Sequence, residues 1–161
     1  MKTLLMMRHA KSSWEYDVGD RERPLKKRGM TDAKVIAEKF NELDIEPDRI
    51  YSSPSNRALS TCHIFLDNTE ISYKKLEIIE DLYDFGGQSV VNFIKKIPDE
   101  YQTAMIFGHN HAFTAVVNTY GSRYIDNLPT AGLAMINFEI TSWKDLKKGE
   151  TQLLLLPRDY R

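Results

Sequence analysis

The chain has 161 residues, of which 42% are hydrophobic and 28% charged, a composition typical of a soluble globular protein with one domain over residues 1–161. Its formal net charge of −1 gives no support for binding to nucleic acid or a membrane surface, so any attraction for anions must be local. The single cysteine, Cys62, excludes an internal disulfide, and no stretch is long enough to span a membrane. The apolar run at the N-terminus is too short for a signal peptide, which makes a cytoplasmic location the default expectation.

The first predicted element is a buried strand over Thr3–Met7, a short and mostly apolar run that ends in polar residues. Arg8 and His9 follow the end of this strand. In open α/β sheets, ligands bind beyond the carboxyl ends of the strands. Arginine offers there a planar fork of donors that matches phosphate oxygens, and histidine offers a nitrogen nucleophile.

The polar residues Lys11–Arg28 predict a long loop beside these two side chains. An amphipathic helix is expected over Thr31–Leu43, because apolar residues recur there at spacings of three and four and Thr31 can cap its first turn. A short strand is expected over Arg49–Ser52.

Ser53 and Pro54 predict the start of the next helix, with serine as the cap and proline in the first helical position. Arg57 lies one turn into that helix, so its side chain can point back over the end of the preceding strand. The amides of a helix N-terminus and an arginine together suit an anion.

Strands and helices continue to alternate in the second half of the chain. The predicted elements are a strand at Lys75–Ile79, a loop at Glu80–Gly87, a helix from about Gln88 to Pro98, a buried strand at Thr103–Phe107, a helix from the residues after Gly108-His109-Asn110 to Gly121, and strands at Ala134–Ile140 and Leu153–Leu156. This alternation predicts an α/β fold, a three-layer α/β/α sandwich with a mostly parallel central sheet.

Five stretches in this order extend over most of the chain: Leu5–Trp14, Arg23–Gly29, Ser52–Pro54 with Arg57-Ala58, Gly108–Asn110 and Leu128–Gly132. In these stretches and their order the sequence resembles the histidine phosphatase (phosphoglycerate mutase-like) superfamily, and most closely its short, SixA-like branch of phosphohistidine phosphatases. One departure is Ala10, which stands where many members have glycine; its methyl group is expected to be tolerated but could narrow the floor of the pocket.

The resemblance implies a metal-independent phosphatase in which His9 attacks phosphorus and forms a phosphohistidine intermediate. The chemistry agrees, because a phosphoryl transition state spreads charge over three equatorial oxygens and needs positive donors and an in-line nucleophile. Nearby arginines favour the neutral, nucleophilic form of His9. No cofactor or metal ion is expected, since the arginines neutralise the phosphate. The catalytic residues implied are Arg8, His9, Arg57 and His109, and the substrate-binding residues are Arg8, Arg57, His109, Asn110 and Ser12.

A general acid for the leaving group is the least defined part of this predicted site. The carboxylates after the third strand are Glu80, Asp81 and Asp84, and none lies in a recognisable acid motif. A phosphohistidine substrate depends less on an acid, because imidazole is a better leaving group than an alkoxide. A chain of this length also has no room for a large cap, so we expect an open site that suits a protein-borne phosphate.

Three functions are therefore compared. The first is a protein phosphohistidine phosphatase, and the alternative with the same catalytic set is a phosphomonoesterase of small metabolites. The third is of a different class, either a metal-dependent hydrolase that uses His9, His109 and His111 or a phosphate-binding module without turnover. The expected partner is a phosphorylated protein or a small phosphorylated metabolite, and neither nucleic acid nor a membrane.

Overall fold

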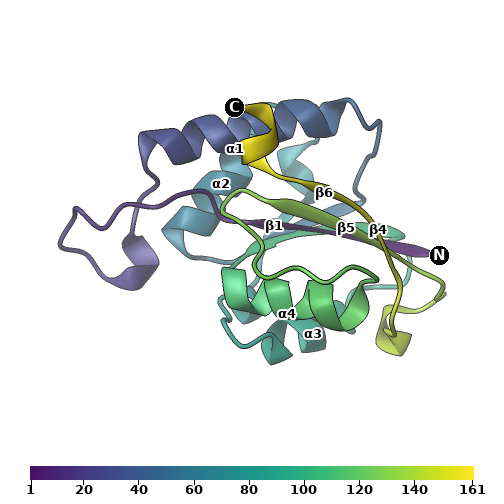
Figure 1. Ribbon diagram of the computed structural model, residues 1–161. Coiled ribbons are helices and arrows are strands. Elements are labelled where there is room, and N and C mark those ends of the chain that lie inside the picture. The colour runs from purple at the N-terminus through teal and green to yellow at the C-terminus, as the bar shows by residue number, and fades with distance from the viewer.

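The computed structural model describes residues 1–161, and it has one six-stranded sheet between two layers of helices (Figure 1). The strands are β1 (Lys2–Arg8), β2 (Arg49–Ser52), β3 (Leu76–Ile78), β4 (Thr103–Gly108), β5 (Leu133–Phe138) and β6 (Glu150–Leu155). The helices are α1 (Lys27–Asn41), α2 (Asn56–Asp67), α3 (Gln88–Ile94) and α4 (Asn110–Tyr120). This is the α/β/α sandwich that the alternation of elements predicts.

The strand order in the sheet is β3-β2-β4-β1-β5-β6. β1, β2, β3 and β4 are mutually parallel, whereas β5 pairs antiparallel with both β1 and β6. β5 is thus the one reversed strand, and the prediction of a mostly parallel sheet is confirmed. The parallel strands bring the carboxyl ends of β1, β2 and β4 to the same edge of the sheet.

The two faces of the sheet carry separate hydrophobic clusters. Helices α1 and α2 cover one face and α3 and α4 cover the other (Figure 1). In β1, Leu5 and Met7 pack on the side of α1 and α2, and Leu4 and Met6 pack on the side of α3 and α4. Burial on both faces explains why this strand is continuously apolar in the sequence.

Helix α1 begins at Lys27, four residues before the predicted start at Thr31, whose hydroxyl donates to the carbonyl of Lys27 within the helix. The loop before it is closed at its base, because Ser12 and Leu25 form an isolated bridge and the amide of Lys26 donates to the carbonyl of Lys11 at 2.8 Å. The chain is therefore already fixed at Lys26 and the helix can follow at once. The predicted loop Lys11–Arg28 is correspondingly shorter.

Helix α2, by contrast, begins later than predicted, and its cap is Ser55 rather than Ser53. The hydroxyl of Ser55 accepts a hydrogen bond from the amide of Ala58 at 3.3 Å. The hydroxyl of Ser53 instead lies 3.0 Å from Nε2 of His109 and accepts a hydrogen bond from the amide of Ser55 at 3.3 Å. Arg57 consequently lies in the first turn of α2.

The last two strands differ from the prediction at their ends. β5 ends at Phe138, so Ile140 lies outside it, and β6 begins at Glu150 rather than Leu153. None of the helices is both long and apolar enough to cross a membrane.

Candidate active site

Strand register brings the two predicted site histidines together. Arg8 at the end of β1 is opposite Gly108 at the end of β4, so His9 and His109 are the next residues on two adjacent parallel strands. The amide of His9 donates to the carbonyl of Gly108 at 3.0 Å, and the two imidazole rings lie 5.4 Å apart between centroids. Both side chains are buried, with 7% of His9 and 1% of His109 exposed.

The ring of His9 is held by its own backbone neighbour. Nδ1 lies 2.8 Å from the carbonyl oxygen of Ala10. Because a carbonyl can only accept, Nδ1 carries the proton and Nε2 keeps its lone pair. The tautomer with a free Nε2 is the one that a nucleophilic imidazole requires.

Ala10, which replaces a glycine of the resembling family, is compatible with this arrangement. Its backbone has no positive φ, its amide donates to the hydroxyl of Thr61 at 2.9 Å, and its methyl group belongs to the cluster under α1 and α2. The methyl group packs in the core.

Arg8 and Arg57 lie close to both histidines and keep unused donors. Nη1 of Arg8 donates to the carbonyl of Leu128 at 2.9 Å, and the Nε atoms of both arginines are buried without a hydrogen-bond partner. Buried donors are almost always paired in proteins, so two unpaired guanidinium Nε–H groups at one site indicate a place for an anion.

His109 is surrounded by hydrogen-bonding groups. Its Nε2 lies 3.0 Å from the hydroxyl of Ser53 and its Nδ1 lies 3.5 Å from Nη2 of Arg57. Because the arginine can only donate, Nδ1 accepts and Nε2–H donates to Ser53. The rings of Tyr83 and Phe85 pack on the same imidazole, at 5.4 and 4.8 Å between centroids.

Both histidines are neutral in this site. Burial first, and then the positive charges of Arg57, Arg8 and Arg23, lower the pKa of His9 to about 3, although its bond to Ala10 opposes the shift. Burial, followed by His9 and Arg57, lowers the pKa of His109 to about 3. The expectation of a neutral His9 therefore agrees with the structure, with burial as the larger cause. His109 is a neutral donor in the free protein.

The site is less open than expected because a carboxylate lies over Arg57. Nη2 of Arg57 donates to Oδ2 of Asp20 at 3.0 Å, and Nη1 donates to the backbone carbonyl of the same residue at 2.6 Å. The hydroxyl of Tyr83 donates to the same Oδ2 at 2.6 Å. Although partial burial opposes it, these bonds from Tyr83 and Arg57 lower the pKa of Asp20, so the carboxylate is ionised.

The two predicted auxiliary binding residues are placed differently from the central four. Ser12 is half-buried, and its hydroxyl accepts from Nη1 of Arg23 at 2.8 Å. Asn110 is the first residue of α4, and its side-chain oxygen accepts from Thr114 at 2.9 Å. The structure thus groups Arg8, His9, Arg57 and His109, with Ser12 reaching the site only through Arg23.

Three residues of the site were not singled out from the sequence: Asp20, Arg23 and Tyr83. Arg23 is buried, stacks 3.5 Å from the ring centroid of Trp14 and contributes to the low pKa of His9. Its place in the stretch Arg23–Gly29 was the one signal that could have identified it. Asp20 begins a short 3₁₀ turn (Asp20–Glu22) and Tyr83 follows another (Glu80–Leu82), and neither turn has a recognisable pattern in the sequence.

None of the three carboxylates considered as general acid points at His9. Glu80 is exposed and pairs with Arg21, and Asp81 is exposed. The carboxylate of Asp84 accepts from the amides of Gly86, Gly87 and Val90 at 3.0–3.1 Å, which stabilises the start of α3.

Comparison with known proteins gives a family for this arrangement. The family model of the histidine phosphatase superfamily (branch 1) matches residues 4–104, which is more than half of the chain. The chain belongs to the histidine phosphatase superfamily. It is therefore a phosphatase that works through a histidine.

Individual proteins and solved structures also match this histidine phosphatase over most of its length. It is 26% identical to an uncharacterised protein of Mycobacterium tuberculosis over 89% of this chain and 93% of that protein, and 28% identical to an uncharacterised chloroplastic protein of Arabidopsis thaliana over 89% and 70%. Its fold is similar to the protein histidine phosphatase SixA complexed with tungstate, with a TM-score of 0.80, 17% identity and 99% of each chain covered. It is also similar to the mycobacterial glucosyl-3-phosphoglycerate phosphatase, with a TM-score of 0.69, 12% identity and coverage of 95% and 98%.

The metal hypothesis requires His9, His109 and His111 to lie together, and the structure does not show such a group. His111 is exposed, one residue into α4 from Asn110, and no group of three or more His, Cys, Asp or Glu side chains is arranged to hold a metal ion.

Proposed function

We propose that the protein is a protein phosphohistidine phosphatase that works through a covalent phosphohistidine on His9. The observation that carries the nucleophile assignment is the bond from Nδ1 of His9 to the carbonyl of Ala10, which leaves Nε2 unprotonated at a site with two unpaired arginine donors. A nucleophile held in one tautomer and beside cations fits attack on a phosphate.

In the first step, Nε2 of His9 attacks phosphorus. The P–N bond forms as the bond to the leaving group breaks, and the electron pair of that bond departs with the leaving group. Arg8 and Arg57 bind the equatorial oxygens, because their Nε–H groups have no other partner. The phosphate also binds the guanidinium of Arg57, either in place of the Asp20 carboxylate or together with it.

In the second step, water attacks phosphorus from the side that the leaving group vacated. The P–N electron pair returns to Nε2 of His9, inorganic phosphate is released, and one proton of the water passes to solvent. His109 lies 5.4 Å from His9 between ring centroids and keeps an Nε2–H donor that can turn from Ser53 to the phosphoryl oxygens. A bound dianion favours protonation of this imidazole, which strengthens that bond.

The choice of phosphohistidine follows from the carboxylates around the site. An alkoxide leaving group needs a proton, but Asp20 is ionised between Arg57 and Tyr83, and Glu80, Asp81 and Asp84 have other partners or face solvent. Imidazole leaves with less assistance. A substrate with a P–N bond therefore matches this set of groups better than a sugar or serine phosphate.

The test compares turnover of four substrates in the presence of EDTA: a phosphohistidine-containing protein, a phosphoserine peptide, a sugar phosphate and p-nitrophenyl phosphate. We expect the phosphohistidine protein to have the highest kcat/KM, and EDTA to have no effect. His9→Ala is expected to lose both turnover and the acid-labile phosphoenzyme label, because nucleophile and intermediate disappear together.

Two outcomes would contradict the proposal separately. A preference for the sugar phosphate by more than tenfold would make the protein a metabolite phosphatase with the same nucleophile. Turnover that survives in His9→Ala, or that returns only with added zinc or magnesium, would remove His9 as the nucleophile.

A further inference from the structure

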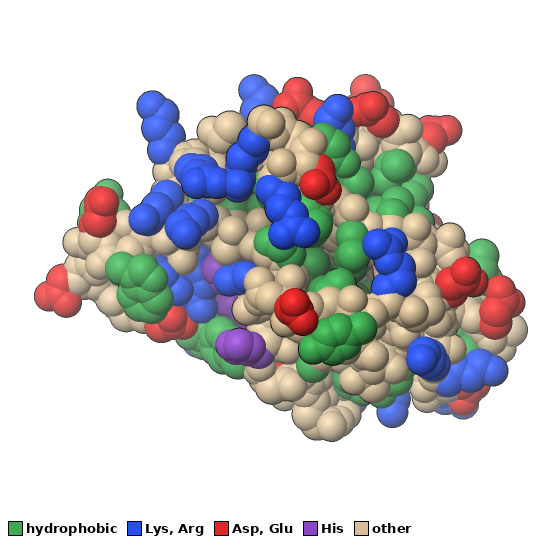
Figure 2. Space-filling model, viewed as in Figure 1, with side chains coloured by type: hydrophobic (Ala, Val, Ile, Leu, Met, Phe, Trp, Pro, Cys, Tyr) green, Lys and Arg blue, Asp and Glu red, His purple; other side chains and the backbone are tan.

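A group of basic side chains lies next to the site, on the outer side of the loop Leu128–Ala131. They line a pocket of about 230 Å³, whose main residues are Lys11, Arg28, Arg158, Arg161, Pro129 and Thr130. Figure 2 shows Lys and Arg side chains gathered on this face, over the beginning of α1 and the C-terminal turn. No Asp or Glu residue lines the pocket, in a chain whose net charge is only −1. The pocket is therefore a local centre of positive potential.

Most of this charge is not neutralised within the chain. Arg161 donates to the carboxylate of Asp32 at 2.7 Å. Lys11, Arg28 and Arg158 take part in none of the six ion pairs of the structure, and all three are exposed. Three unpaired cations around one small pocket fit an anionic group from another molecule.

A single loop separates this basic pocket from the phosphoryl site. The carbonyl of Leu128 accepts from Nη1 of Arg8 at 2.9 Å, and the amide of Ala131 donates to the carbonyl of His9 at 3.1 Å. Pro129 and Thr130, between them, line the basic pocket. Lys11 lies two residues after His9, so the pocket begins where the catalytic strand ends.

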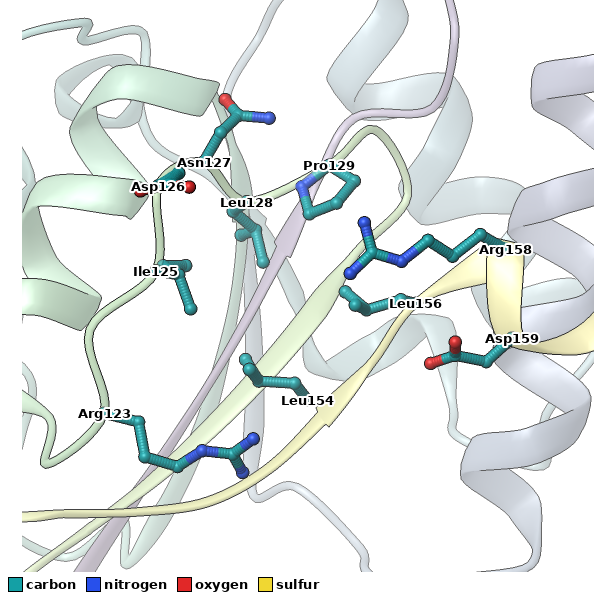
Figure 3. Close-up of a pocket in the computed structure, with 10 residues that line it drawn as sticks. All are labelled: Arg123, Ile125, Asp126, Asn127, Leu128, Pro129, Leu154, Leu156, Arg158 and Asp159. Carbon is teal, nitrogen blue, oxygen red and sulfur yellow. The ribbon is translucent and has the colours of Figure 1, made fainter.

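A larger groove of about 470 Å³ continues from the basic pocket and shares Pro129, Leu156 and Arg158 with it. Figure 3 shows Arg158 and Arg123 reaching toward the groove from its two ends, with Leu154 and Leu156 between them. Carboxylates of Asp126 and Asp159 are also among its lining residues, so this groove is mixed in charge and partly apolar.

We propose that the basic pocket and the adjoining groove bind an acidic segment of the phosphorylated partner protein and thereby hold its phosphohistidine at His9. This inference rests on the proposed function. A small metabolite would need only the phosphoryl site, whereas a protein segment continues beyond the phosphorylated residue. Glutamate or aspartate matches the unpaired cations, and the leucines of the groove suit apolar side chains of a peptide rather than a nucleic acid backbone.

The experiment uses two synthetic peptides with one phosphorylated histidine each, one flanked by glutamates and the other by serines and glycines. We expect the acidic peptide to have a kcat/KM about fivefold to tenfold higher at low salt, with the difference shrinking as salt rises. Arg28→Glu and Arg158→Glu should each reduce this preference, and the double variant should abolish or reverse it. Turnover of p-nitrophenyl phosphate reports on the phosphoryl site, to which neither arginine is linked by a hydrogen bond or an ion pair.

Lys144→Glu is the matched control, because Lys144 is exposed beside Trp143, whose ring lies under Lys2 at the opposite end of β1. It should keep the preference for the acidic peptide. Equal turnover of both peptides by the parent would overturn the docking inference while leaving the proposed function intact. Turnover of p-nitrophenyl phosphate but of neither peptide would contradict the proposed function itself. Inhibition by a single-stranded oligodeoxynucleotide that exceeds inhibition by a glutamate peptide would overturn the inference in favour of nucleic acid.

Discussion

Oδ2 of Asp20 lies 3.0 Å from Nη2 of Arg57, and the same Nη2 lies 3.5 Å from Nδ1 of His109. Arg57 therefore already holds an anion of the chain itself at the edge of the site. Only 2% of Arg57 is exposed, whereas 45% of the Asp20 side chain is accessible, so the carboxylate is the partner that can move. An incoming phosphoryl group competes with Asp20 for this guanidinium.

The first prediction concerns this competition. Asp20→Asn removes the negative charge but keeps the shape of the side chain, so tungstate or phosphate should inhibit p-nitrophenyl phosphate hydrolysis more tightly. A charge-assisted hydrogen bond contributes about 1.5–3 kcal/mol, and loss of even the lower value as a competitor corresponds to roughly tenfold tighter inhibition. The measurement is the inhibition constant of the anion at fixed pH.

The control for Asp20→Asn is Glu22→Gln, an exposed acid of the same turn, which should leave the inhibition constant unchanged. Weaker anion inhibition in Asp20→Asn would show the opposite role, in which the carboxylate orients Arg57 for phosphate. That result would rule out competition.

The second prediction concerns protonation of the two histidines. In the free protein both have a pKa of about 3, set mainly by burial. Bound phosphate or tungstate places negative charge beside them and should raise both values. Histidine ¹⁵N chemical shifts over a pH titration, with and without tungstate, measure the change, and His9→Gln assigns the signals. Unchanged titration curves with tungstate bound would contradict the convergence of both rings on the anion.

The same low pKa values have a consequence for stability. The unfolded chain binds protons at the ordinary histidine pKa of 6.5, whereas the folded chain does so only near 3. Because the unfolded state binds more protons in this window, the free energy of unfolding should decrease as pH falls from about 6.5 toward 3. Urea denaturation at several pH values measures it, and His109→Gln should show a weaker dependence.

The positions of the central four residues could be predicted because each lies at the end or the beginning of an element with a clear signal. Continuous apolar runs define β1 and β4, and parallel strands end at one edge, so Arg8, His9 and His109 had to lie close together. The position of Arg57 depended on a helix start, and this was predicted in the right segment although its cap is Ser55.

The rest of the site depends on contacts between loops and short 3₁₀ turns, which hydrophobic periodicity does not predict. Asp20 lies 37 residues from Arg57 and 63 from Tyr83 along the chain, and it meets them because the loop before α1 lies against α2. The cap of α2 is Ser55, whereas Ser53 bonds to His109, a partner 56 residues away. Hydrophobic patterns fix where elements pack, but such polar partners are set by tertiary structure.

The third prediction concerns the general acid. Glu80→Gln, Asp81→Asn and Asp84→Asn should each keep p-nitrophenyl phosphate activity within a few-fold of the parent, and none should lose activity on an alkyl phosphate selectively. A true acid typically contributes roughly 10²–10⁴-fold where the leaving group needs a proton. Selective loss on the alkyl phosphate, in any one variant, would identify the acid and promote the metabolite alternative.

Stability separates Asp84 from the other two carboxylates. The two carboxylate oxygens of Asp84 together accept from three backbone amides before and within the first turn of α3. Asp84→Asn removes the charge and replaces one accepting oxygen by a donor, so it should lower the free energy of unfolding by about 1.5–3 kcal/mol, the range for a hydrogen bond to a charged group. Glu80→Gln and Asp81→Asn change exposed side chains and should unfold close to the parent temperature. Measuring Tm on the same preparations distinguishes a folding defect from a catalytic one.

The last prediction concerns Gly29, which lies inside α1 against the backbone of Lys11, two residues after His9. A Cβ at this position would lie 2.3 Å from the carbonyl oxygen of Lys11, which is backbone and cannot rotate away. In an open helix, Gly→Ala stabilises by about 1 kcal/mol, but here the overlap should dominate, with a net loss of roughly 1–3 kcal/mol. Since Lys11 lies two residues after His9, Gly29→Ala should also reduce kcat. Gly86→Ala is the matched control, because a Cβ there meets nothing closer than 3.9 Å, and it should change neither Tm nor kcat by much. A Tm of Gly29→Ala at or above that of the parent would mean that α1 does not pack on Lys11 as described, and that the end of β1 is positioned by other contacts.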